Sequence, residues 1–195
     1  MNHKHDGKSC VICDGVATGK TRDEVVAEIL GGMEAKITEH GVMVHAIDGQ
    51  GTAPSFAYTT GMTEMGLPEV FMIGLPAQHA ANGVYGYFHQ IKAGALLPDT
   101  RTVTTLFNLP VEVVDVTGAE QFAALADLCS FTTDYYESKG KSVQWQQIVM
   151  SDREGLFPWE EGFDTDLMEH AQPLFGVPAA VEALFEAVDP ATTVH

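Results

Sequence analysis

The order in which helical and strand patterns follow one another constrains the fold of this chain more than any single motif. Apolar residues recur at helical spacing after the capping box Thr21/Glu24 and continue to Gly41. Further segments carry strand or helix patterns and are separated by turn residues. We predict strands at 42–47, 56–60, 70–73, 102–107, 111–116 and 143–150, and helices at 78–93 and 120–138.

This order predicts an α+β fold in which helices pack on one antiparallel or mixed sheet. With 195 residues, of which 45% are hydrophobic, the chain is long enough for one sizeable core and short for two. We therefore predict a single domain over 20–165, preceded by a Cys- and His-bearing arm at 1–19. Residues 166–195 are predicted to form a helical extension, in which Val181, Leu184, Phe185 and Val188 make one stripe.

The negative net charge of the chain argues against some classes of binding partner. The chain carries 10 Lys and Arg against 27 Asp and Glu, a formal net charge of −17. Such a charge repels nucleic acid and anionic lipid surfaces, so we expect neither as a ligand. The sequence shows no apolar run long enough to cross a membrane and no secretory leader, and we expect a soluble, cytoplasmic protein.

Cys10-Val11-Ile12-Cys13 is the sharpest local motif in the sequence. Two thiolates at this spacing can bind one tetrahedral zinc ion, although they supply only half of its ligands. His5 is a candidate for a further ligand, as are His3 and the histidines of the core. A thiol–disulfide pair and an inert pair are the alternatives, whereas Cys129, inside an apolar helical pattern, is expected in the core.

Two groups of polar and aromatic residues are candidates for ligand binding. Tyr58, Thr59 and Glu69 flank the connection from Gly61 to Pro68, where hydroxyls and a carboxylate would line the rim of a pocket. The alternative is that Tyr58 packs in the core and Glu69 stabilises a turn, because most aromatic residues of strands are packing residues.

Gln147, Asp152 and Trp159 form the second group, around the end of the last predicted strand. Binding residues often lie at strand ends and in the loops that follow. A buried glutamine that satisfies neighbouring backbone groups would give the same pattern, so this alternative also stays open.

Two stretches resemble the bacterial domain of unknown function 4262 family. The first is Phe56-Ala57-Tyr58-Thr59-Thr60-Gly61-Met62 with Pro68-Glu69 and Gly74-Leu75, and the second is the segment from Gln147 to Trp159. Together they bracket about 37–164. Ser151 replaces the family's usual proline, and Cys10-x-x-Cys13-Asp14 resembles the start of some actinobacterial members. The resemblance implies no activity, because the family has none established.

The leading hypothesis is a binding or accessory protein from a bacterium or phage, in which both groups form one surface and zinc bound by Cys10 and Cys13 anchors the arm. One alternative is a metal-dependent enzyme with an open metal position and Glu69 or Asp152 as general base. Another is an acidic inhibitor or immunity-type protein that presents its carboxylates to a basic partner. A closed four-ligand site indicates a structural metal, whereas an open one permits catalysis.

Overall fold

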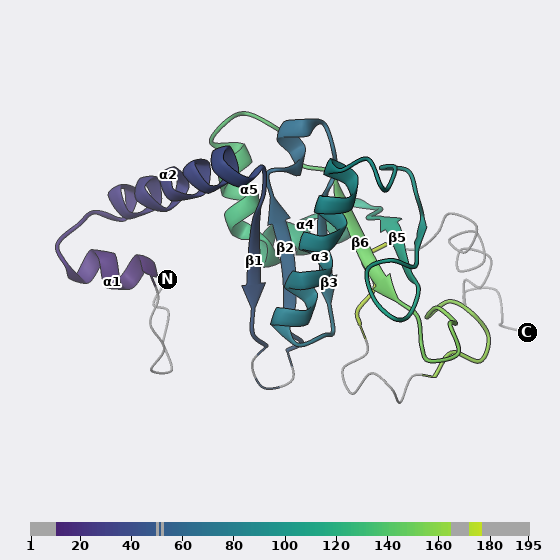
Figure 1. Ribbon diagram of the computed structural model, residues 1–195. Coiled ribbons are helices and arrows are strands. Elements are labelled where there is room, and N and C mark those ends of the chain that lie inside the picture. Colours follow the sequence, from purple (N-terminus) through teal and green to yellow (C-terminus); the bar gives the residue numbers. More distant parts are fainter. Residues whose placement is uncertain (1–10, 50, 52, 165–171, 177–195) are drawn as a thin grey trace, which may run out of the picture. The chain divides into compact units, whose positions relative to one another are not determined.

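The structure, a computed structural model, describes residues 11–49, 51, 53–164 and 172–176 (Figure 1). The chain divides into two compact units, Met1–Met43 and Val44–His195, which are considered separately. Among the described residues, no helix combines the length and the apolar character needed to cross a membrane.

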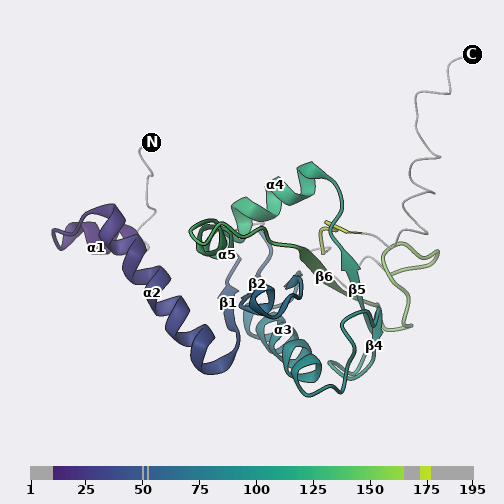
Figure 2. The same cartoon turned by 90° about the horizontal axis from the view of Figure 1, so that it is seen from above.

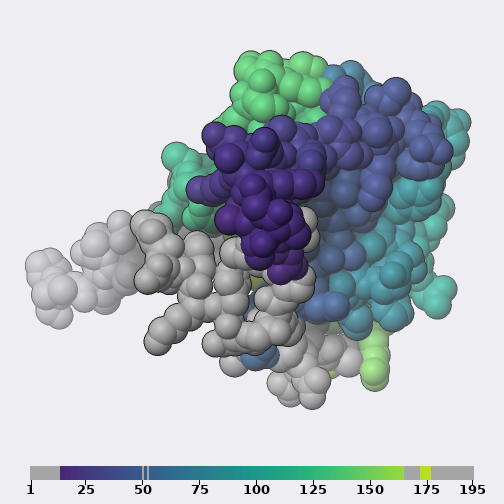
Figure 3. All heavy atoms as spheres, turned by 90° about the vertical axis from the view of Figure 1, so that its left-hand side faces the viewer, coloured from purple at the N-terminus to yellow at the C-terminus, as the bar shows by residue number. Residues whose placement is uncertain are grey.

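The first unit contains α1 (Val11–Ala17) and α2 (Arg22–His40). The predicted capping box is confirmed: Thr21 Oγ1 accepts from the Glu24 backbone N–H at 3.3 Å, and the Glu24 carboxylate accepts from the Thr21 N–H at 2.8 Å. Gly41 ends α2 in the left-handed conformation, with φ 88°. The surface of this unit is purple and dark blue in Figure 3, and most exposed residues of α2 are polar or charged.

Six strands form one mixed sheet in the order β1-β2-β3-β6-β5-β4. Strand β3 pairs in parallel with β6, whereas the pairs β2–β3, β4–β5 and β5–β6 are antiparallel. The predicted α+β fold with a mixed sheet is thus confirmed. The strands are β1 (Met43–Ile47), β2 (Phe56–Thr60), β3 (Glu69–Ile73), β4 (Thr102–Val103), β5 (Val111–Asp115) and β6 (Trp145–Met150).

Helices cover both faces of this sheet (Figure 2). Helix α3 (Ala77–Lys92) packs on β2 and β3, whereas α4 (Ala119–Leu128) and α5 (Ser130–Glu137) lie on the opposite face. Gly83 of α3 permits the side chain of Phe107 to approach the helix closely, because a Cβ there would lie 2.6 Å from Phe107 Cζ. The helix therefore needs this glycine, despite the lower helix propensity of the residue.

Two predicted elements differ from the structure, and one helix was not predicted. The helix predicted at 120–138 is two helices, with a break at Cys129, whose φ of −105° and ψ of 39° are not helical. The strand predicted at 102–107 is limited to the two residues of β4. Helix α1 lies within the predicted arm, where no periodicity indicated it.

A large part of the predicted helical extension, including its apolar stripe, lies outside the described residues. Residues 172–176 are described, and they are not helical.

The core on the α4–α5 face is rich in aromatic side chains. It contains Tyr58, Phe71, Leu125, Cys129 and Trp145, with other apolar residues packed around them. Cys129 is fully buried, as its apolar surroundings in the sequence predicted, and burial raises the pKa of its thiol. Because side chains alternate along a strand, Trp145, Gln147 and Val149 of β6 share this face.

Candidate functional site

Glu69, the first residue of β3, is a fully buried carboxylate with 0% exposure. Its Oε1 accepts from the backbone N–H groups of Gly61 at 3.0 Å and Thr63 at 2.9 Å, and from the Tyr136 hydroxyl at 3.0 Å. Its Oε2 accepts from Thr59 Oγ1 at 2.6 Å. Burial and the neighbouring carboxylate raise the pKa of Tyr136, so the phenol stays protonated and donates. Four donors therefore hold the carboxylate in place.

A chain of hydroxyl groups extends from this carboxylate towards β1. Thr132 of α5 donates to the Thr59 carbonyl at 3.0 Å, and its Oγ1 lies 2.6 Å from that of Thr60. His45 Nε2 lies 2.9 Å from Thr60 Oγ1. Since each hydroxyl has one proton and Thr132 uses its own on the carbonyl, Thr60 donates to Thr132 and His45 Nε2 donates to Thr60. The chain thus selects the histidine form with a proton on Nε2.

Tyr58 packs in the core beside this chain. Its ring stacks on His45 with centroids 4.6 Å apart and meets the edge of Trp145 at 6.4 Å. Only 1% of Tyr58 is exposed, and burial raises the pKa of its phenol. In this structure Tyr58 is therefore a packing residue and does not line an open pocket.

Gln147 of β6 is also fully buried, and its side chain binds another part of the same chain. Its Nε2 donates to the Pro173 carbonyl at 2.8 Å, and its Oε1 accepts from the Phe175 N–H at 2.8 Å. Both ends of the amide are thus engaged by a segment 26 to 28 residues further along the chain.

Asp152 organises the loop that follows β6. Its Oδ1 accepts from the N–H groups of Glu154 at 3.0 Å and Leu156 at 2.8 Å, and its Oδ2 accepts from the Asp164 N–H at 3.0 Å. Desolvation opposes the charge of this carboxyl, but the backbone donors outweigh it and lower its pKa. Trp159 stacks on Phe157 in the same loop, with centroids 5.4 Å apart. The carboxylate therefore holds a loop together.

The structure brings together some of the predicted binding residues and separates others. Thr59 and Glu69 are in direct contact, with Tyr58 in the adjoining core. Gln147 lies beneath residues 173–175, and Asp152 and Trp159 lie in the loop beyond β6. The donors from α5, Thr132 and Tyr136, were not predicted, because they are 63 or more residues away from Glu69 in the sequence.

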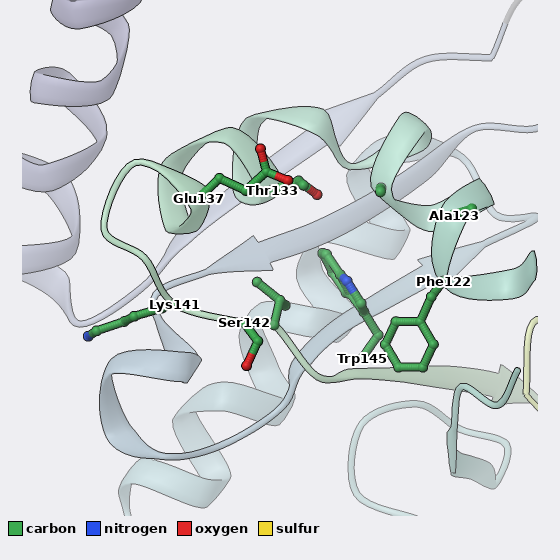
Figure 4. A pocket seen from close by; sticks show the side chains of 9 residues that line it. Phe122, Ala123, Thr133, Glu137, Lys141, Ser142 and Trp145 are labelled. Carbon is green, nitrogen blue, oxygen red and sulfur yellow. The ribbon is translucent and has the colours of Figure 1, made fainter. Parts of the chain in front are cut away.

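A pocket of about 310 Å³ opens on the α4–α5 side of the sheet (Figure 4). Apolar side chains of α4 and β6, together with Val143, and polar side chains of α5 and of the connection to β6 line this pocket. The lining residues are Phe122, Ala123, Ala126, Thr133, Glu137, Lys141, Ser142, Val143 and Trp145. No pattern in the sequence pointed to it, because it arises where α4 and α5 diverge above β6.

The two aromatic rings of this pocket lie together on one side, and the polar side chains of α5 lie on another (Figure 4). In Figure 4 the indole of Trp145 and the ring of Phe122 lie on one side, and Glu137 and Thr133 lie on α5. Lys141 is directed away from the indole, and its Nζ lies 2.5 Å from Glu64 Oε2. The pocket therefore has an apolar floor and a carboxylate on its wall.

The predicted zinc ligands lie at the edge of what the structure describes. Cys13 is in α1, but its side chain is not described, and His5 and Cys10 lie outside the described residues. Within the described part of the chain, no three His, Cys, Asp or Glu side chains gather closely enough to hold a metal ion.

A comparison with protein-family models identifies the domain. Residues 36–164 match the model described as domain of unknown function (DUF4262). The chain belongs to the DUF4262 family. The matched range agrees with the resemblance seen in the sequence, and it includes the sheet, α3 to α5, the Glu69 cluster and the pocket of the DUF4262 domain. Comparisons with curated proteins and with solved structures gave no match.

Proposed function

We propose that this protein is a cytoplasmic binding or accessory protein whose DUF4262 domain receives a small ligand in the pocket between α4, α5 and β6. The observation that carries the proposal is that this open pocket has an aromatic floor, formed by Trp145 and Phe122. The two carboxylates considered as general bases, Glu69 and Asp152, instead accept several hydrogen bonds within the fold. This arrangement favours binding over acid–base catalysis.

The lining of the pocket indicates the chemistry of the ligand. Trp145 and Phe122 offer flat apolar surfaces, and Glu137 offers a negative charge beside Thr133 on α5. The one cation of the lining, Lys141, is already paired with a carboxylate. The net charge of −17 also attracts cations to the surface. These features favour a small amphipathic cation, with an aromatic or branched apolar body and an ammonium group.

A titration with 2-phenylethylamine, followed by amide and indole NMR shifts, tests this proposal. We expect shifts at the Trp145 indole N–H and the Phe122 amide, and no binding of the anionic analogue 3-phenylpropionate. Glu137→Gln should weaken binding about fivefold, because an exposed ion pair contributes up to ~1 kcal/mol. Glu120→Gln, on an exposed residue of α4 outside the pocket, serves as the matched control.

Filling the pocket provides a second variant for the same titration. Ala126→Phe places a ring in the space beside Trp145 and should abolish the shifts while the protein stays folded. Equal binding of the amine and the carboxylate, or shifts that do not include Trp145, would contradict the proposal.

We also propose that Cys10, Cys13 and His5 bind a structural zinc ion. Support comes from the Cys-x-x-Cys spacing and from the place of Cys13 in α1, because two cysteines three residues apart at the start of a helix can approach one ion. A fourth ligand would close the site, as is typical of structural zinc.

Elemental analysis of untagged protein, purified without added metal, tests the zinc proposal. We expect one zinc per chain, lost in the double variant Cys10→Ser/Cys13→Ser and reduced in His5→Ala. Cys129→Ala removes the buried core thiol and should retain the zinc. Metal-free wild-type protein would overturn this proposal and leave the pocket proposal intact.

A further inference from the structure

Residues 172–176 lie on the face of the sheet that carries α4, over β6 and β5 (Figures 1 and 2, yellow-green). This segment, Gln-Pro-Leu-Phe-Gly, is outside the DUF4262 match, which ends at residue 164. A segment from beyond the domain thus occupies a surface of the domain itself.

The backbone of this segment is bound by a side chain of the sheet. Gln147 donates to the carbonyl of Pro173 and accepts from the N–H of Phe175, both at 2.8 Å. The side-chain amide of Gln147 therefore binds two backbone groups of the segment, the Pro173 carbonyl and the Phe175 N–H. Gln172 makes the reciprocal contact, since its side chain accepts from the Met150 N–H at 3.2 Å and donates to the Met150 carbonyl at 2.8 Å.

The side chains of the segment also fit the surface. Phe175 meets Phe71 edge to face, with centroids 5.5 Å apart. Leu174 packs against the cluster around Val114 and Val149. Gly176 lies so close to the backbone of β5 that a Cβ there would overlap the Asp115 carbonyl oxygen. The surface therefore selects an aliphatic residue, a phenylalanine and a glycine in this order.

This surface requires a polar occupant. Gln147 is 0% exposed, and the hydrogen bonds described for its side chain go to Pro173 and Phe175. With the segment removed, the amide loses both partners in an apolar setting, which is unfavourable for a buried polar group. Residues 36–164 contain this surface, and the segment that covers it lies beyond that range.

We propose that Gln147, Met150, Phe71 and the backbone of β5 at Asp115 form a peptide-binding surface, which residues 172–176 occupy in cis. Its ligand in trans is a short segment of a partner protein with the same chemistry. That segment offers Gln147 a backbone carbonyl and a backbone N–H, and carries an aliphatic residue, Phe and Gly in this order. The cis segment competes with this partner, because its tether gives it a high effective concentration at the surface. The proposal rests on contacts of Gln147 and Phe175 and is independent of the ligand pocket.

Fluorescence anisotropy with a labelled peptide of the sequence 170–178 tests this competition in the full-length protein. The double variant Phe175→Ala/Gly176→Val removes the ring and introduces the overlap with Asp115, so it should release the cis segment. We expect the peptide to bind this release variant at least about tenfold more tightly than the wild type. Pro173→Ala, at an exposed position of the segment, is the matched control and should behave like the wild type.

Comparisons with further variants of the protein and with a variant peptide separate specific from nonspecific peptide binding. Gln147→Ala, added to the release variant, should remove the gain in affinity, whereas Glu137→Gln in the ligand pocket should not. A peptide with the same Phe→Ala and Gly→Val exchanges should not bind.

Sedimentation of the release variant should show a monomer, and a dimer would overturn the proposal in favour of exchange of the segment between two copies.

Equal peptide affinity in the wild type and in a cooperatively folded release variant would also overturn the proposal, since the segment would then be an ordinary part of the core. If the double variant does not fold cooperatively, Phe175→Ala alone replaces it, with the same expected order of affinities. In that single variant, faster amide hydrogen exchange at residue 175 than in the wild type reports release of the segment, and unchanged exchange together with unchanged affinity contradicts it.

Discussion

Glu69 and Asp152 are both buried carboxylates that accept several hydrogen bonds, but their donors come from different ranges of the chain. The donors to Glu69 lie in β2, in the turn after it and in α5, up to 67 residues away. The backbone donors to Asp152 all lie within 12 residues. Glu69 therefore joins distant elements of the domain, whereas Asp152 stabilises one loop. The difference shows that two similarly buried carboxylates can stabilise the whole fold in one case and only a local segment in the other.

The largest effect is expected for Glu69→Ala. The change leaves the hydroxyls of Thr59 and Tyr136 and two backbone N–H groups without their acceptor, and should lower the free energy of unfolding by about 4 kcal/mol. Urea unfolding measures this loss. Glu64→Ala, in the same turn but with a more exposed carboxylate that pairs with Lys141, should cost less than about 1 kcal/mol. Similar losses in the two variants would contradict the distinction.

Thr132→Val tests the hydroxyl chain between α5 and β2. Valine keeps the shape but loses the bonds to the Thr59 carbonyl and to Thr60, and we expect a loss of about 1–2 kcal/mol in urea unfolding. The neighbouring Thr133, whose hydroxyl lies 3.4 Å from the Cys129 carbonyl, provides the control Thr133→Val, with an expected change below about 0.5 kcal/mol. Equal losses of unfolding free energy in Thr132→Val and Thr133→Val would contradict the role given to the Thr132 hydroxyl.

The smallest effect is expected for Asp152→Asn, and it should depend on pH. Because the folded state lowers the pKa of Asp152, its carboxylate stabilises the fold above the unfolded pKa of about 3.9, and this contribution is lost as the pH falls through the folded pKa. The difference in unfolding free energy between wild type and variant should therefore be constant from pH 7 to about pH 5 and shrink below about pH 4.

Hydrogen exchange locates the effect of Asp152→Asn. Protection should fall at the amides of Leu156 and Asp164, which donate to the carboxylate, and remain unchanged in β2 and β3. Asp99→Asn, at an exposed position, is the control and should leave protection unchanged. Loss of protection throughout the sheet would show that the Asp152 loop supports the whole domain, as Glu69 does.

The sequence was sufficient to predict the elements whose pattern is local. The capping box at Thr21 set the start of α2, and short runs of apolar and β-type residues between turn residues indicated the strands of the mixed sheet. The break at Cys129 was missed, because apolar residues continue at helical spacing on both sides of it. Gly83 has a low helix propensity, and the close contact between α3 and Phe107 that requires a glycine there is not visible in the sequence.

The candidate site was harder to predict, because its contacts join residues far apart in the chain. The pairing of Thr59 with Glu69 across one short connection was accessible from the sequence, but the donation from Tyr136 was not. The binding partner of Gln147, the segment at 172–176, lies outside the family's residue range. The pocket at Trp145 was missed for the same reason, since it depends on where α4 and α5 diverge.

The claim that the pocket binds an amphipathic cation is tested most directly by the fluorescence of Trp145. The chain has two tryptophans, so Trp159→Phe leaves Trp145 as the single reporter, and Trp145→Phe leaves Trp159 as the matched control. We predict that 2-phenylethylamine changes the fluorescence of the first variant in a saturable way and leaves the second unchanged. An unchanged Trp145 signal, or the same response from Trp159, would contradict the assignment of this pocket as the binding site.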